Sequence, residues 1–154
     1  MRKVLWANQR MGLACAWCED KHIHICIRSV MAEPRGPSCS SPALLIAFHD
    51  LDDLAPAEFH GGLFTDAQAT QIVEFVKGND PDATILINCE AGVSRSSAVA
   101  ASLSKFFNGD DNEVFKHSVP NMFVFRKMLK ALEIDSTSTY EQKEKEDWFG
   151  KSRP

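Results

Sequence analysis

Hydrophobic and polar positions along this chain alternate between segments typical of β-strands and segments with helical periodicity. Four short apolar segments have the length of β-strands, and one of them alternates polar and apolar residues, which is typical of a strand with one buried face. Between and after them, apolar residues recur at helical spacing. The predicted strands are 3–7, 22–27, 44–48 and 83–87, and helices are predicted between a capping box at 65–68 and Gly78, then over 96–107, 112–118 and 120–132.

Strands that alternate with helices in this way indicate an α/β fold. We expect a central, mostly parallel sheet flanked by helices, with loops at 33–42 and 50–62, where proline and glycine are frequent. The length of 154 residues suits a single domain over 1–154, in which residues 135–154 form a polar C-terminal tail or the end of a helix.

Composition and charge narrow the function. Seventeen basic residues against 21 acidic ones give a net charge of −4, which argues against nucleic acid or an anionic membrane as a partner. No apolar run approaches the ~20 residues of a membrane span, and the N-terminus lacks the apolar core of a signal peptide. The five cysteines are odd in number and irregularly spaced, which favours a reducing, cytoplasmic location. Any anion site must therefore be built locally, from backbone dipoles and a few basic side chains.

The segment between the strand at 83–87 and the helix at 96–107 offers such a site. Ligands bind at this end of the strands in open α/β sheets. Backbone N–H groups of a loop here, together with the N-terminus of the helix, favour both the thiolate of Cys89 and a bound phosphate. Gly92 permits a conformation that a side chain would obstruct, and Arg95 supplies a planar, bidentate donor for phosphate oxygens. The Ser96 hydroxyl is suited to donate a hydrogen bond to the Cys89 sulfur.

These residues resemble the signature of the protein tyrosine and dual-specificity phosphatase superfamily, which is a cysteine, five residues, an arginine and then serine or threonine. The resemblance is strong over residues 65–132 and is closest to small dual-specificity members and short bacterial relatives. It implies that Cys89 is the nucleophile, that Ser96 stabilises its thiolate, and that neither metal nor cofactor takes part. The phosphate-binding loop that it implies consists of Glu90, Ala91, Gly92, Val93, Ser94 and Arg95.

One position departs from the pattern of that superfamily. Its members usually have histidine immediately before the cysteine, where the ring orients the loop through hydrogen bonds. Here the residue is Asn88, which can keep some of those hydrogen bonds but cannot carry a charge.

The resemblance also implies a general acid upstream of the cysteine, on a separate loop, because the leaving oxygen of an ester needs a proton. Asp50, Asp52 and Asp53 follow the strand at 44–48. Asp50 comes first after the strand, and His49-Asp50 resembles the polar-aspartate pair of dual-specificity members. We therefore predict Asp50 as the general acid and Asp53 as the alternative.

The predicted function is hydrolysis of phosphomonoesters on protein, at phosphotyrosine or with dual specificity, through a cysteinyl-phosphate intermediate. The predicted partners are a phosphorylated protein or peptide and phosphate-like anions. Three alternatives stay open: a catalytically weak pseudophosphatase, suggested by Asn88; a phosphatase acting on a non-protein phosphate ester; and a rhodanese-like sulfurtransferase, which Arg95-Ser96 fits less well.

A second group of side chains has the donor atoms of a zinc site. Cys15 and Cys18 form a C-x-x-C pair, and His22, His24 and Cys26 follow. Their spacing fits no common zinc finger, so we predict no metal site and interpret Cys15 and Cys18 as small buried side chains. Whether another thiol, such as that of Cys26, lies close enough to Cys89 to form a protective disulfide stays open at this point.

Overall fold

The computed structural model describes residues 2–14 and 21–134. Four strands form one sheet in the order β1-β4-β2-β3, and every neighbouring pair is parallel. The predicted α/β fold with a parallel sheet is therefore confirmed. The strands are β1 (Val4–Asn8), β2 (His22–Arg28), β3 (Ala43–Ala47) and β4 (Thr84–Cys89), within one or two residues of the predicted bounds.

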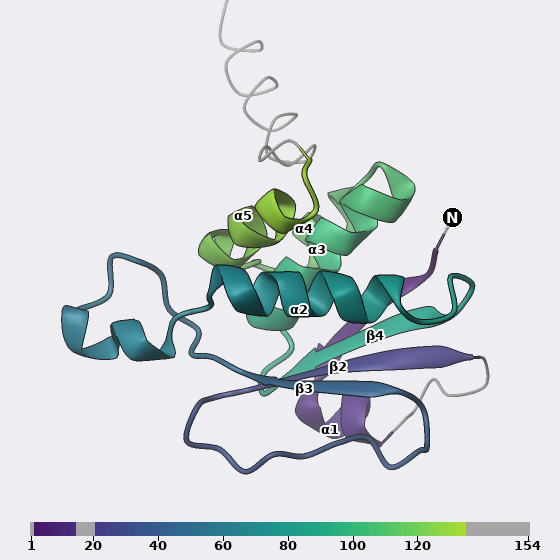
Figure 1. Cartoon of the computed structure of the whole chain (residues 1–154), viewed down its shortest axis with the longest axis horizontal. Coiled ribbons are helices and arrows are strands. Elements are labelled where there is room, and N and C mark those ends of the chain that lie inside the picture. Colours follow the sequence, from purple (N-terminus) through teal and green to yellow (C-terminus); the bar gives the residue numbers. More distant parts are fainter. Residues whose placement is uncertain (1, 15–20, 135–154) are drawn as a thin grey trace, which may run out of the picture.

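Helices cover the two faces of the sheet unequally (Figure 1). One face carries α2 (Asp66–Lys77), α3 (Arg95–Asn108), α4 (Asn112–His117) and α5 (Met122–Ala131), whereas the short α1 (Gln9–Leu13) lies on the other. The capping box that begins α2 is present: Gln68 N–H donates to the Thr65 hydroxyl, and Thr65 N–H donates to the Gln68 side chain, both at 3.1 Å. The chain leaves α3 through Gly109, whose φ of 71° is left-handed, as is common after helices.

The main core lies between the sheet and α2, α3 and α5. Alternate residues of β2 and β4 point into it, so that the buried layer is rich in isoleucine. The facing side of α3 is rich in alanine, which lets the helix approach the sheet closely. The core side chains of these three elements include Ile23, Ile25, Ile27, Ile85, Ile87, Ala98, Ala100 and Ala101.

The second face of the sheet is buried as well, which corrects the prediction that β2 is buried on one face only. His22, His24 and Cys26 alternate with the core isoleucines, yet all three are buried. The polar alternation was misleading because α1 and residues 29–42 cover this face (Figure 1). Burial, and to a smaller extent the neighbouring His22, lowers the pKa of His24 to about 4.

Two other local predictions need correction. The segment 50–62 is not all loop, because Ala57–Gly62 forms the 3-10 helix η1. Pro120 does not lie in the first turn of α5, because Asn121 caps that helix and Met122 begins it. Among the described residues, no helix is long and apolar enough to cross a membrane. Cys15, Cys18 and the predicted tail at 135–154 lie outside the described residues.

Candidate active site

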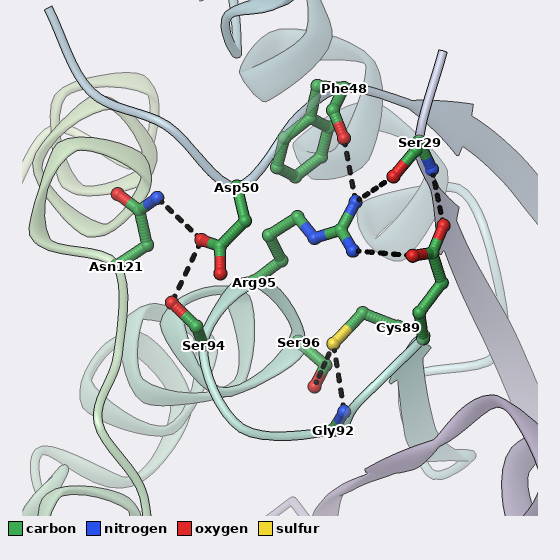
Figure 2. Close-up of polar contacts among 10 residues, drawn as sticks. Ser29, Phe48, Asp50, Cys89, Gly92, Ser94, Arg95, Ser96 and Asn121 are labelled. Atoms are coloured by element: carbon green, nitrogen blue, oxygen red, sulfur yellow. Dashed lines mark hydrogen bonds and ion pairs between the residues drawn. The ribbon is translucent and has the colours of Figure 1, made fainter. Parts of the chain in front are cut away.

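The predicted site residues meet at the carboxyl ends of the parallel strands β2, β3 and β4 (Figure 2). Ser29 follows β2, Asp50 follows β3, and Cys89 is the last residue of β4, so that the parallel sheet brings three distant segments together. Arg95, the first residue of α3, lies between them. The position at the carboxyl edge was predicted from the order strand, loop, helix.

The loop from Cys89 to Arg95 has a conformation that requires glycine at its centre. Gly92 has a φ of 72°, and a Cβ atom at this position would collide with the backbone of Ala7 and Asn8. The turn at Gly92 directs its N–H toward the Cys89 sulfur, at 3.2 Å. Gly92 therefore both permits the close approach to β1 and supplies a donor to the sulfur.

Three other segments hold this loop in place through hydrogen bonds to its backbone carbonyls. The first residue of α1 donates from Gln9 N–H to the Glu90 carbonyl at 3.4 Å. The connection between α4 and α5 donates to the Val93 and Ser94 carbonyls at 3.3 and 3.0 Å. Within α3, the Ser97 hydroxyl donates to the Val93 carbonyl at 2.6 Å. The loop is thus anchored on several sides before any ligand binds.

Cys89 lies at the floor of the loop with only 2 % of its surface exposed. Its sulfur and the Ser96 hydroxyl share a hydrogen bond of 3.2 Å, which agrees with the predicted contact between the two residues. The N-terminus of the 14-residue helix α3 adjoins the loop. A negative charge on this sulfur therefore faces the Gly92 N–H, the Ser96 hydroxyl and the positive end of a helix dipole.

Arg95 is almost fully buried, and three groups fix its guanidinium. Nη1 donates to the Phe48 carbonyl at 2.8 Å and to the Ser29 hydroxyl at 3.3 Å, and Nη2 lies 3.5 Å from the Glu90 carboxylate. A guanidinium has five N–H donors in one plane. Within the described part of the chain, these contacts use both N–H groups of Nη1 and one of Nη2, so that Nε and the second N–H of Nη2 can donate to a bound anion.

Glu90, predicted only as a member of the phosphate loop, contributes in a second way through its side chain. Its carboxylate accepts a hydrogen bond of 3.0 Å from Ser29 N–H and pairs with Arg95. The hydrogen bonds from Ser29, together with the charge of Arg95, hold the pKa of Glu90 below its ordinary value. The carboxylate is therefore charged at neutral pH and helps to orient Arg95.

The two candidates for the general acid are placed differently. Asp50 Oδ1 accepts hydrogen bonds of 2.9 Å from the Ser94 hydroxyl, which belongs to the loop, and from the Asn121 side chain (Figure 2). Asp50 and Asp53 both line a surface hollow of about 930 Å³. Among the described residues, however, no hydrogen bond joins Asp53 to the loop. The structure thus brings Asp50, and not Asp53, into contact with the loop of Cys89.

Sequence reasoning missed Ser29 and Asn121. Ser29 is the first residue after β2, and the rule that sites form at carboxyl strand ends could have found it. Asn121 falls at the start of the helix predicted over 120–132, and no contact with a distant residue is predicted for it. Its side chain caps α5 with its oxygen, while its nitrogen donates to Asp50 and to the Leu51 carbonyl. One amide thereby joins a helix end to the loop after β3, which the sequence gives no means of pairing.

Asn88 and Cys26 lie on the face of the sheet opposite Cys89. The two are register partners in β2 and β4, so their side chains share the face that α1 covers. Asn88 is 1 % exposed and packs beneath Gly12. Because Cys89 points to the other face, a disulfide between Cys26 and Cys89 would require the sheet to rearrange.

No protein-family model matches this sequence, and no curated protein sequence matches it. Solved structures do resemble it in fold. Human DUSP28 superposes with a TM-score of 0.52 at 17 % identity, over 84 % of this chain and 91 % of that one. PTPMT1 in complex with PI(5)P gives 0.53 at 14 % identity, over 86 % and 94 %.

A third similar structure is the human tyrosine phosphatase-like serine/threonine/tyrosine-interacting protein, with a TM-score of 0.52 at 14 % identity, over 84 % of this chain and 95 % of that one. These matches agree with the resemblance of the segment from Cys89 to Ser96. The chain therefore has the fold of the protein tyrosine and dual-specificity phosphatase superfamily.

Proposed function

We propose that this protein is a cysteine-dependent phosphatase that hydrolyses phosphomonoesters. The observation that carries the proposal is the arrangement around Arg95: a buried cysteine with donors aimed at its sulfur, a fixed guanidinium, and a loop-bound aspartate. In the first step, the Cys89 thiolate attacks phosphorus and the bond to the leaving oxygen breaks. In the second step, water attacks the cysteinyl-phosphate and releases phosphate.

Arg95 and the backbone N–H groups of the loop stabilise charge on the phosphoryl oxygens in both steps. This role is supported by the contacts of Arg95 with Phe48, Ser29 and Glu90, which orient the guanidinium before substrate arrives. The Arg95 side chain therefore loses its conformational entropy when the protein folds and not during the reaction. Ser96 donates to the sulfur when it leaves as a thiolate.

Asp50 protonates the leaving oxygen in the first step and takes a proton from the attacking water in the second. Its contacts with Ser94 and Asn121 both use Oδ1. The other carboxylate oxygen, Oδ2, is the atom we assign to the proton transfer. Ser94 thus connects the acid with the loop that binds the phosphoryl group.

A phosphorylated peptide is the substrate class that the surroundings favour. The hollow beside Asp50 and Ser94 is lined by four acidic and three basic side chains, a balance that disfavours substrates with several phosphates. Leu54 and Val119 line the same hollow and are 88 % and 74 % exposed. Exposed apolar side chains beside a phosphate site suit the side chains that flank a phosphorylated residue.

The alternative of a phosphate-binding module without turnover derives its support from Asn88. The contacts described above weigh against it, because the Asn88 side chain lies on the far face of the sheet from Cys89 and Arg95 is oriented without it. The presence of asparagine at position 88, in place of the usual histidine, therefore affects the loop only indirectly. We place catalysis ahead of binding alone.

The test is hydrolysis of para-nitrophenyl phosphate by the wild type and by Cys89→Ser, with Cys26→Ser as the matched control. We expect Cys89→Ser to abolish turnover and Cys26→Ser to keep it. Rapid acid quenching of the wild type should trap one phosphate on Cys89, detected by mass spectrometry. Wild-type protein that binds vanadate but hydrolyses nothing would instead establish the binding module, and sulfur trapped on Cys89 would establish a sulfurtransferase.

The substrate class is tested by comparing kcat/KM for phosphotyrosine peptides, phosphoserine peptides and PI(5)P vesicles, the last because a lipid of that kind is present in the similar PTPMT1 structure. We expect the peptides to be preferred. Preference for the lipid would overturn the assignment of substrate while leaving the cysteine mechanism intact.

A further inference from the structure

Two histidines and a cysteine meet on the face of the sheet that α1 covers. His22 and His24 are on β2, and Cys39 comes from the connection between β2 and β3. One nitrogen from each ring and the Cys39 sulfur all lie within 4.8 Å of one another. The Nε2 atom of His22 is 3.3 Å from the Cys39 sulfur, and the two imidazole centroids are 4.7 Å apart.

This spacing is close to that of ligands around one tetrahedral ion. Zinc binds imidazole nitrogen at about 2.0–2.1 Å and thiolate sulfur at about 2.3 Å, which places such ligands roughly 3.5 Å apart. The His22–Cys39 distance already lies within a few tenths of an ångström of that value. His22 and His24 are two residues apart on β2 and therefore project from the same face of the sheet. A moderate rotation of these side chains would bring the other ligand atoms, now within 4.8 Å, to the same spacing.

The donor set selects the kind of ion. Imidazole with thiolate suits zinc, whereas magnesium and calcium require oxygen ligands, and the cluster has none. His24 is fully buried and His22 nearly so, which confines both rings to this face of the sheet. We propose that His22, His24 and Cys39 form a zinc-type metal site, with Cys39 as its one thiolate ligand and the fourth position taken by water.

The proposed site is distant from the chemistry. His22 pairs with Thr84 and His24 with Leu86, which are five and three residues before Cys89 in β4. At ~3.3 Å per residue these positions lie about 10–16 Å along the strand from the sulfur, on the opposite face of the sheet. The ion therefore touches no substrate phosphate. Its effect is to fasten residues 29–42 to β2, beside the hydrogen bond from Ser38 N–H to the Leu13 carbonyl.

This site differs from the group that the sequence suggested. The sequence pattern associated the two histidines with Cys15, Cys18 and Cys26, and its spacing predicted no metal. Of these three cysteines, Cys26 alone lies among the described residues. In the structure, Cys26 shares their face of the sheet but is not part of the cluster, and Cys39 takes its place from 13 positions further along the chain. The long connection between β2 and β3 brings Cys39 to the histidines, and the path of this connection could not be derived from residue spacing.

The experiment uses the full chain, stripped of metal with a chelator and titrated with Co²⁺ and then Zn²⁺. We expect a thiolate-to-cobalt charge-transfer band, displaced by one equivalent of zinc, and a rise in Tm of roughly 5–10 °C at a hundredfold excess of zinc over Kd. Cys39→Ser should lose the band and weaken zinc binding by at least about 100-fold, because loss of an outer-shell partner alone costs up to about that much. Cys26→Ser is the matched control, a buried thiol of the same strand and face as the histidines, and should keep both.

Circular dichroism without metal verifies that each variant is folded. If Cys39→Ser disrupts the fold, His22→Gln supplies the same test, because it should keep the thiolate band but weaken zinc binding. A band that survives in folded Cys39→Ser would assign the ion to other thiols and overturn the site. Absence of any band or Tm shift in the wild type would also overturn it. Neither outcome bears on hydrolysis by Cys89, which is measured separately in the presence of chelator.

Discussion

At the scale of single residues, the candidate site depends on groups that hold its Arg95 and Asp50 side chains in place. Arg95 is aimed by Phe48, Ser29 and Glu90, and Asp50 is held by Ser94 and Asn121. A group that is oriented before the substrate binds needs less reorganisation in the reaction. The first two predictions concern Asp50, which we propose takes part in the reaction, and Glu90, which we propose only orients Arg95.

We expect Asp50→Asn to lower kcat about 100- to 1000-fold on alkyl phosphates or phosphoserine peptides, because an alkoxide leaves poorly without a proton. On para-nitrophenyl phosphate, whose leaving group is good, the loss should be much smaller. Asp53→Asn is the matched control from the same loop and should change neither rate. A larger loss in Asp53→Asn would reverse the assignment of the acid.

Glu90→Gln tests the role of the carboxylate beside Arg95. We expect the Ki of inorganic phosphate to rise about threefold to tenfold, because Arg95 loses a charged partner. Folding should be retained, since the amide oxygen of the substituted side chain can still accept the hydrogen bond from Ser29 N–H. A variant with unchanged Ki would show that Phe48 and Ser29 suffice to orient the guanidinium.

The same variant has a defined pH dependence. Hydrogen bonds from Ser29 and the charge of Arg95 lower the pKa of Glu90 in the folded state below its ordinary 4.5. A lowered carboxyl pKa stabilises the fold above the unfolded value and loses that effect as the pH falls through the folded value. The difference in unfolding free energy between wild type and Glu90→Gln should thus be constant above about pH 6 and shrink below 4.5. A difference that grows toward acid would contradict this account.

At the scale of secondary-structure elements, the ends of helices do most of the positioning. The start of α3 closes the loop from Cys89 to Arg95, and the start of α5 reaches Asp50 through Asn121. This residue performs two tasks with one amide, since its oxygen caps the helix while its nitrogen holds Asp50.

Two substitutions separate those tasks. Asn121→Ser keeps a capping hydroxyl but loses the donor to Asp50, so we expect kcat on poor leaving groups to fall about tenfold with little loss of stability. Asn121→Ala loses the cap as well, and its free energy of unfolding should fall by about 1 kcal/mol. Activity that follows stability in both variants, measured by urea unfolding beside the kinetic assay, would mean that the contact with Asp50 is incidental.

At the scale of the whole molecule, the surface around the site gathers apolar side chains from separate loops. Leu54 follows β3 and Val119 precedes α5, and both line the hollow beside Asp50. We expect Leu54→Ser with Val119→Ser to raise KM for a phosphopeptide about threefold to tenfold, since each loses a part of its apolar contact. KM for para-nitrophenyl phosphate should not change. Met31→Ser, in another exposed apolar side chain outside the hollow, is the control.

The sequence by itself determined the four strands, the main helices and the loop from Cys89 to Arg95. Strand and helix periods are local properties, so the four strands, α2 with its capping box and the end of α3 at Gly109 were all predictable. Contacts that lie within one short segment were predictable for the same reason. They include the approach of Ser96 to Cys89 and the need for glycine at position 92.

Only the tertiary structure decided which distant residues meet. Ser29 and Glu90 are 61 positions apart and Asp50 and Asn121 are 71 apart, and no periodic pattern connects them. The same holds for the second face of the sheet, where α1 and residues 29–42 bury a strand that alternates polar and apolar residues and bring Cys39 to the histidines. The physical reason is that backbone periodicity depends on neighbours in the chain, whereas packing and side-chain hydrogen bonds depend on how layers close over one another.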